Sequence, residues 1–162
     1  MLQSVIDKEM ANLNLKSIQS RTSQLRDVII KTPMINLHSP YLNKELSAKN
    51  IFLKLECFQH TGTFKARGAI SVSSSISLEN QKKGFTAASA GNHAIAAAWA
   101  ARKMGTSAKV VMRSTANPYR IARVKEEMAE IKIVHDVKEL FEEAEKLVKE
   151  ENRTFIHPFE GI

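Results

Sequence analysis

The stretch TGTFKARGA at positions 61–69 decides what fold and chemistry we expect of this 162-residue chain. It places one lysine, Lys65, between Gly62 and Gly68 and directly after an apolar segment. Glycine has no Cβ, so the backbone on both sides of the lysine can approach a planar ligand closely. Lysine is also the side chain that forms Schiff bases with carbonyl compounds. Taken alone, however, the stretch is more typical of a solvated lysine at the start of a helix, because most lysines are surface residues.

A second stretch, SAGNH at positions 89–93, follows an apolar segment and precedes an alanine-rich one. At the start of a helix, unpaired backbone N–H groups and the helix dipole favour an anion such as a substrate carboxylate. Asn92 can donate and accept hydrogen bonds and therefore suits a phenolic oxygen. The alternative, equally supported, is that Ser89 or Asn92 is only an N-cap and Gly91 only a tight turn. His93 is more typical of a packing residue than of a base.

The chain after Gly84 predicts a regular alternation of strands and helices. We expect strands at 85–89, 108–112, 131–134 and 154–157, and helices at 92–103, 118–128 and 137–150. Such alternation with short connections predicts an α/β fold in which helices pack on both faces of a parallel sheet. The helix that includes residues 94–101 is nearly all apolar and is expected to be buried.

The chain before Gly84 is less regular. We expect two helical pieces within 1–31, a short helix from Ser39-Pro40 to Leu46, a strand at 51–56, a helix at 64–76 that its serines weaken, and a turn at 81–84. The change near Gly84 predicts a domain boundary. We therefore expect residues 1–83 to belong to a larger domain, 84–158 to form a smaller α/β domain, and 159–162 to return to the larger one.

Composition excludes several classes of protein. Apolar residues make up 43% and charged residues 25%, which is ordinary for a soluble globular protein. No run approaches the ~18 apolar residues of a membrane span, and the first sixteen residues lack the apolar core of a signal peptide. The single cysteine, Cys57, excludes an internal disulfide and fits a reducing, cytoplasmic compartment. No Cys/His cluster has zinc spacing, so we expect no metal.

The net charge of +7 does not by itself indicate a nucleic-acid partner. Lysines are spread along the chain and interleaved with glutamates, as in residues 138–151, and no arginine-rich arm occurs. No Walker A motif and no GxGxxG motif is present, so nucleotide binding has little support.

Together, the two stretches resemble the signatures of the serine/threonine dehydratases, which are pyridoxal-phosphate enzymes of the tryptophan synthase β fold (fold type II). The TGTFKARGA stretch resembles their lysine motif, and ASAGNHA at 88–94 is similar to their second signature. Thr32-Pro33, LKLE at 53–56 and HPF at 157–159 also resemble family positions. The resemblance is colinear from about residue 31 onward, and two unrelated motifs in the same order argue against coincidence.

The resemblance implies a cofactor, pyridoxal 5'-phosphate, and a role for each motif residue. Lys65 would form the Schiff base with the cofactor and later move the substrate α-proton, and Phe64 would pack beside the cofactor. Asn92 would bind the phenolic oxygen of the cofactor. The loop that holds the substrate carboxylate would consist of Ser89, Ala90, Gly91, Asn92 and His93.

The implied reaction removes the α-proton and the β-hydroxyl from L-threonine or L-serine and yields a 2-oxo acid and ammonia. The resemblance thus implies a small-molecule amino-acid substrate, a place in amino-acid metabolism such as isoleucine biosynthesis, no nucleic-acid or membrane partner, and a homo-oligomer for a full-length protein. Two enzymatic alternatives stay open: a serine racemase-like enzyme and a dehydratase for other β-hydroxy amino acids.

Three departures from the family pattern matter. Ala90 stands where the related serine racemases place a serine hydroxyl, and Met128 stands where the family usually has a helix-ending glycine. The family's glycine-rich phosphate loop should follow Ile162, so the chain corresponds to an N-terminal half, with the fold incomplete at its C-terminus. We therefore expect this segment alone to bind the cofactor weakly and to fold marginally. A catalytically inactive, truncated member of the family is the remaining alternative.

Overall fold

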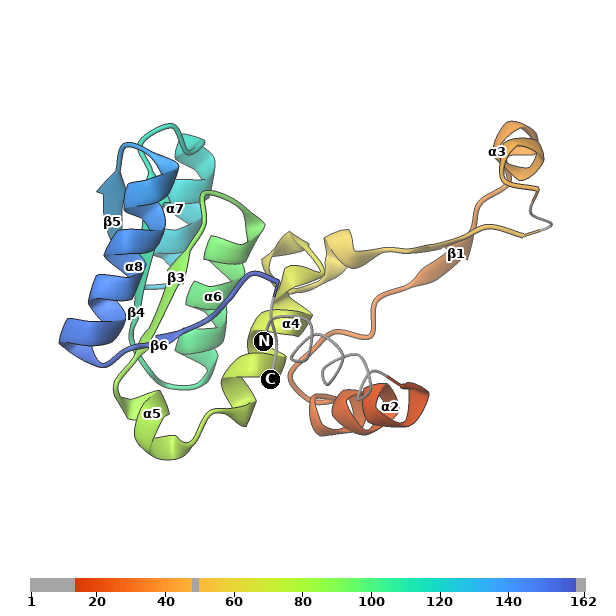
Figure 1. Ribbon diagram of the computed structural model, residues 1–162. Helices are drawn as coiled ribbons and strands as arrows, with labels where there is room; N and C mark the ends of the chain where they lie inside the picture. Colours follow the sequence, from red (N-terminus) through yellow and green to blue (C-terminus); the bar gives the residue numbers. More distant parts are fainter. Residues whose placement is uncertain (1–13, 48–49, 160–162) are drawn as a thin grey trace, which may run out of the picture.

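The computed structural model describes residues 14–47 and 50–159. The first of the two helical pieces expected within 1–31 lies largely outside these residues. The C-terminal part of the chain forms a four-stranded parallel sheet in the order β5-β4-β3-β6 (Figure 1). Its strands are β3 (Phe85–Ala88), β4 (Ala108–Arg113), β5 (Glu130–Val134) and β6 (Thr154–Phe155). The predicted parallel sheet is thus confirmed.

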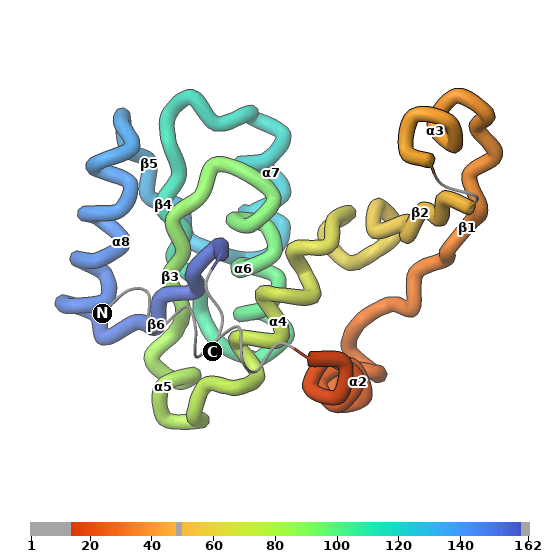
Figure 2. Tube along the Cα trace, turned by 45° about the vertical axis from the view of Figure 1, so that its right-hand side comes forward, coloured from red at the N-terminus to blue at the C-terminus, as the bar shows by residue number. Residues whose placement is uncertain are grey.

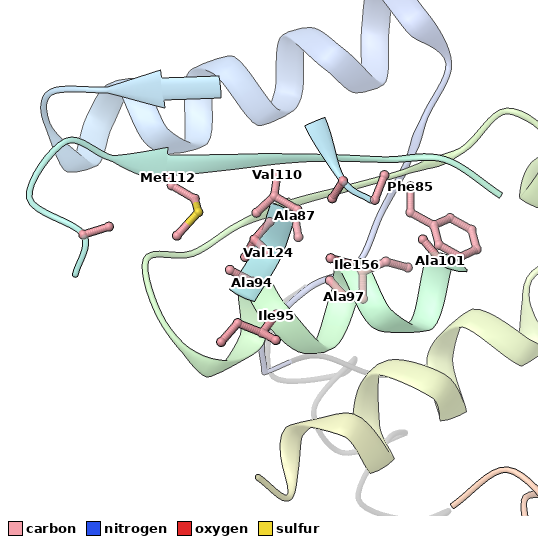
Figure 3. Close-up of a cluster of buried hydrophobic side chains, with 14 residues drawn as sticks. Phe85, Ala87, Ala94, Ile95, Ala97, Ala101, Val110, Met112, Val124 and Ile156 are labelled. Atoms are coloured by element: carbon pink, nitrogen blue, oxygen red, sulfur yellow. The ribbon is translucent and has the colours of Figure 1, made fainter. Parts of the chain in front are cut away.

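Helices cover both faces of the sheet, as expected. On one face, α6 (Asn92–Lys103) and α7 (Pro118–Glu126) pack against Val110 and Met112 of β4. Figure 3 shows part of this cluster between the sheet and α6. On the other face, α8 (Val137–Glu151) packs against Val111. Successive residues of β4 therefore point to opposite layers, as the alternation of side chains along a strand requires.

Helix α6 lies at the centre of the molecule. Every residue from 93 to 101 is buried, which confirms the prediction from its alanine content. The small side chains also let α4 (Lys65–Ser75) pack closely on α6, with Ala66 and Ala69 against Ala96 and Ala100. Because α4 begins at Lys65, this packing ties the lysine motif to the helix that follows the second motif.

The N-terminal part contains α2 (Leu15–Gln24), α3 (Pro40–Glu45) and an antiparallel ribbon of β1 (Met34–Asn36) and β2 (Phe52–Lys54). Figures 1 and 2 both show the ribbon carrying α3 away from the sheet. Two short 3₁₀ turns, η1 (Glu56–Phe58) and η2 (His60–Gly62), connect β2 to α4. The helix at Ser39-Pro40 forms as expected, with the Ser39 side chain accepting a hydrogen bond from the Leu42 N–H.

Several local predictions were wrong. The first two residues of the turn expected at 81–84 belong instead to a helix, α5 (Leu78–Lys82), which Ser77 caps by accepting from the Asn80 N–H. The helix expected to reach Met128 ends at Glu126, because Met128 has a left-handed backbone (φ 61°). The strands expected at 51–56 and 154–157 are shorter, and β1 was not expected at all.

Candidate functional site

Lys65 is the first residue of α4, and its side chain is partly buried. Its Nζ donates a hydrogen bond of 2.7 Å to the carbonyl oxygen of Pro158. The same ammonium lies 4.8 Å from the ring centroid of Phe159 and 5.6 Å from that of Phe64. Aromatic faces attract a cation, so both rings favour this position of the ammonium. Lys65 is therefore held in a defined place rather than extended into solvent.

The Lys65 side chain contributes to a hollow of about 240 Å³ between α4, the start of α6 and the segment after β6. The residues that line this hollow are Phe64, Lys65, Gly68, Ala69, Val72, His93, His157, Pro158 and Phe159. The four residues from α4 have the spacing i, i+3, i+4, i+7, which is one face of a helix. A Cβ added to Gly68 would meet no atom within 4 Å, so this wall of the hollow is open enough for a flat ligand.

The second motif lies at the carboxyl end of β3, the edge at which open α/β sheets bind ligands. Gly91 is the N-cap of α6 and makes no side-chain cap bond, so the alternative in which Ser89 or Asn92 caps the helix is wrong. Ser89 instead accepts from the Gly91 N–H through Oγ (3.1 Å), and Asn92 is exposed. A Cβ at Gly91 would lie 3.4 Å from Arg120 Nη1, so a cation lies beside this loop.

His93 connects the second motif to the hollow. The ring is buried and its Nε2 lies 2.8 Å from the carbonyl oxygen of Ile156. Burial lowers the pKa of His93, and the nearby charges of Lys65 and His157 lower it further, while the bond to the Ile156 carbonyl opposes the shift. A neutral ring that donates from Nε2 satisfies this carbonyl and keeps a second charge away from Lys65.

The structure therefore brings some of the predicted residues together and leaves others apart. Phe64, Lys65 and His93 line one hollow, whereas the residues from 89 to 92 lie at the adjoining start of α6 and do not line it. Sequence reasoning assigned no role to Pro158 and Phe159, although the HPF stretch was among the positions that resemble the family.

A polar cluster behind the lysine was also missed. Arg67 donates to both carboxylate oxygens of Glu56, from Nε to Oε2 (2.7 Å) and from Nη2 to Oε1 (2.8 Å). Thr32 donates to the same Glu56 carboxylate through Oγ1 (2.5 Å). These bonds, with Arg67 as the largest cause, lower the pKa of Glu56 to about 2 despite its partial burial. Glu56 in turn raises the pKa of Arg67.

The donor set suits a planar aldehyde better than a metal ion. An amine with aromatic neighbours and an open glycine wall would accept the ring and aldehyde of such a ligand. In the part of the chain that the structure describes, no three His, Cys, Asp or Glu side chains are grouped to hold a metal. No helix among the same residues has the length and apolar character needed to cross a bilayer.

The comparisons with known proteins agree with this geometry. The family model described as "Pyridoxal-phosphate dependent enzyme" matches residues 25–161. Phenylserine dehydratase from Ralstonia pickettii is 43% identical over 67% of this chain and 33% of its own length. The catabolic L-threonine dehydratase from Staphylococcus aureus is 36% identical over 91% of this chain and 42% of its own length. The structure of maize serine racemase superposes with a TM-score of 0.82 at 28% identity, over 91% of this chain and 44% of the racemase.

The chain thus spans less than half the length of these relatives. The family match nevertheless covers most of the chain, including both motifs and the segment that contacts Lys65. The fold is that of the fold type II pyridoxal-phosphate enzymes. Structures of a serine racemase and of a threonine deaminase are similar to this chain. The chain belongs to the family of pyridoxal-phosphate-dependent enzymes, whose cofactor is pyridoxal 5'-phosphate.

Proposed function

We propose that this chain supplies the lysine-bearing part of a dehydratase that acts on β-hydroxy-α-amino acids, with L-threonine or L-serine as substrate. The observation that carries the proposal is the placement of Lys65 Nζ at the edge of the hollow between α4 and α6. For threonine, the net change is balanced: the amino acid becomes 2-oxobutanoate and ammonia, since the water lost on elimination returns on hydrolysis.

The residues around the hollow have distinct roles in this proposal. Pyridoxal phosphate, when bound, withdraws electrons from the substrate α-carbon. Lys65 Nζ holds the cofactor aldehyde and then takes the α-proton, for which a partly desolvated amine is suited. Phe64 packs against the cofactor ring, and the Phe159 ring attracts the Nζ ammonium. Asn92 donates to the phenolic oxygen of the cofactor.

The uncapped start of α6 is the proposed carboxylate site. The loop Ser89, Ala90, Gly91, Asn92 and His93 binds the substrate carboxylate there through the N–H groups of Ala90, Asn92 and His93, supported by the helix dipole. The other two N–H groups already have acceptors, since Ser89 donates to the Val111 carbonyl and Gly91 to Ser89 Oγ. The Arg120 guanidinium beside Gly91 adds positive charge on the same side. In this proposal, residues 84–158 form the smaller domain, which closes on the substrate, and residues 1–83 belong to the cofactor-anchoring domain. Homo-oligomerisation, a cytoplasmic location and a place in isoleucine biosynthesis stay predictions.

Two alternatives have specific observations behind them. The identity to a phenylserine dehydratase favours a substrate with an aromatic β-substituent, and a comparison of turnover on threonine, serine and phenylserine would distinguish this possibility. The similarity to serine racemase favours racemisation, but the methyl group of Ala90 cannot move a proton. We therefore expect no D-serine from L-serine, and its formation would favour the racemase.

The test begins with the cofactor itself. The purified chain is mixed with pyridoxal phosphate, reduced with borohydride, and digested so that the modified lysine can be identified by mass. We expect modification at Lys65 that Lys65→Ala removes and that Lys103→Ala, at an exposed lysine at the end of α6, leaves unchanged. Modification scattered over many lysines would contradict the proposal.

Turnover gives the second measurement. Lys65→Ala should abolish formation of 2-oxobutanoate from L-threonine, and unchanged turnover would refute the role of the lysine. Selective modification of Lys65 without turnover in the unmutated chain would instead support the inactive, truncated alternative.

A further inference from the structure

Lys65 and Arg67 both lie in the first turn of α4, but their side chains contact different parts of the molecule. Two positions apart on an α-helix correspond to a rotation of about 200°, so their side chains leave α4 on nearly opposite sides. Lys65 enters the hollow, whereas Arg67 reaches Glu56, the first residue of η1. The side of α4 that faces away from the hollow is thus held by a charged pair.

This pair is part of a larger cluster that joins three segments of the chain. Arg67 Nη2 also donates to the carbonyl oxygen of Ile30 (3.1 Å), which accepts a second bond from Gln59 Nε2 (2.8 Å). Thr32 connects the same segment to the Glu56 carboxylate. We name the residues Thr32, Glu56 and Arg67 the α4 clasp. The planar carboxylate of Glu56 accepts hydrogen bonds from Arg67 of α4 and from Thr32. The guanidinium of Arg67 binds this carboxylate in a bidentate manner.

The start of α4 lacks a side-chain cap. Its N-cap, Phe64, makes no side-chain cap bond, and the first turn is held by bonds from the Lys65 N–H to Thr63 Oγ1 (3.3 Å) and from the Arg67 N–H to the Phe64 carbonyl oxygen (3.0 Å), together with the packing of Ala66 on α6. The preceding residues Thr61 and Gly62 both have positive φ, 64° and 74°. A side chain at the N-cap commonly fixes the first turn of a helix. In α4, in place of such a cap, the first turn is also held by the bond of Arg67 to Glu56.

We propose that Arg67 and Glu56 are positioning residues for Lys65: their pairing fixes the rotation and depth of the first turn of α4, and so sets where Nζ lies in the hollow. The inference rests on the proposed role of Lys65 as the residue that binds the cofactor aldehyde. Reactions of positioned groups are sensitive to small displacements, since a shift of about 1 Å can cost as much as about 100-fold in rate.

Two conservative variants test the proposal. Glu56→Gln keeps the size of the side chain and removes its charge. Arg67→Lys keeps the charge and removes the guanidinium group that binds both carboxylate oxygens. In the full chain, we expect each to slow modification of Lys65 by pyridoxal phosphate, trapped with borohydride, by about tenfold. In Glu56→Gln, which adds no lysine, the share of label on other lysines should also rise, because only the environment of Lys65 changes.

The pair Arg102–Glu127 provides a matched control. It has the same Nε–Oε2 distance of 2.7 Å as the clasp, joins α6 to the end of α7, and does not line the hollow. Glu127→Gln should lower the free energy of unfolding yet leave the rate of Lys65 modification unchanged. Equal slowing in Glu56→Gln and Glu127→Gln would mean that loss of stability alone is responsible and would overturn the proposal.

The outcomes also separate this inference from the proposed function. If the unmutated chain shows no selective modification of Lys65, the proposed function fails, and this inference fails with it. If the unmutated chain is modified selectively and both clasp variants react at the same rate, only the positioning role is refuted.

Discussion

The Nζ atom of Lys65 lies 2.7 Å from the carbonyl oxygen of Pro158, a residue 93 positions further along the chain. The segment that brings Pro158 there is itself anchored at Ile156. The Ile156 N–H donates to Thr86 of β3, and the Ile156 carbonyl meets His93 of α6. The segment from Ile156 to Phe159 is therefore hydrogen-bonded to the sheet at its start and contacts Lys65 at its end. An aldehyde that reacts with Nζ has to replace this contact.

Phe159→Leu should accelerate that replacement. The Phe159 ring is largely exposed, so its attraction for the Lys65 ammonium is about 0.5 kcal/mol, and its loss should raise the rate of Lys65 modification by pyridoxal phosphate about twofold. The rate is measured by borohydride trapping. Phe141→Leu, at an exposed phenylalanine of α8, is the control and should change nothing. A rate in Phe159→Leu at or below that of the unmutated chain would show that the ring does not hold the ammonium.

The stability contributed by Glu56 should depend on pH in the acid range. The charges that face this carboxylate are Arg67 and Lys54, and Thr32 donates to it as well. Because they lower the pKa of Glu56 to about 2, the folded state binds its proton less readily than the unfolded chain. The stabilisation is complete above the unfolded pKa and is lost as the pH falls through the folded value. With allowance for partial exposure, it is on the order of 1–2 kcal/mol.

Glu56→Gln isolates this contribution. The free energies of unfolding in urea of the unmutated chain and the variant should differ at pH 6. The difference should shrink by about 1 kcal/mol or more by pH 3, because Glu56 becomes protonated in the unfolded chain while it stays ionised in the folded state. The other carboxylates titrate in both proteins, so their contributions cancel in the difference. A difference that stays constant between pH 6 and pH 3 would show that folding does not lower the pKa of Glu56.

The buried alanines of α6 should not tolerate enlargement. Ala98 has no exposed surface and packs in the core between α6 and the sheet. Ala98→Leu should destabilise the fold by about 1–3 kcal/mol in urea unfolding, because the added atoms have no space. Ala122→Leu, on the exposed side of α7, should change stability by about 0.5 kcal/mol or less. Equal effects at the two positions would contradict the close contact between α6 and the sheet.

Much of the sheet and of α6 could be predicted because local signals agreed there. The alanine-rich run and the turn at Gly105, which has a φ of 69°, gave α6 the same bounds in the sequence and the structure. By contrast, β1 has three residues and every one is exposed, so no pattern of burial marked it. The five residues of α5 are too few for a helical periodicity to appear.

Pairings between distant residues were also beyond sequence reasoning. The serines of α4 appear only to weaken it, yet Arg21 of α2 donates to the Ser71 carbonyl (2.6 Å) and to the Ser71 and Ser75 side chains, so they dock one helix on another. Glu56 and Arg67 were both visible within motifs, but only the folded chain shows that one carboxylate accepts from the arginine and from Thr32. The lysine itself could be singled out, whereas the carbonyl that holds it could not.

The turn after α7 offers a stabilising substitution. Met128 has a φ of 61°, a conformation that disfavours any residue with a Cβ by about 1–2 kcal/mol, and its side chain is 83% exposed, so little packing would be lost. Met128→Gly should therefore raise the free energy of unfolding by about 1 kcal/mol, after the greater chain entropy of glycine in the unfolded state is deducted. Lys125→Gly, at an exposed position inside α7, should lower it by about 1 kcal/mol. Opposite signs in urea unfolding would confirm the left-handed turn, and destabilisation by both substitutions would contradict it.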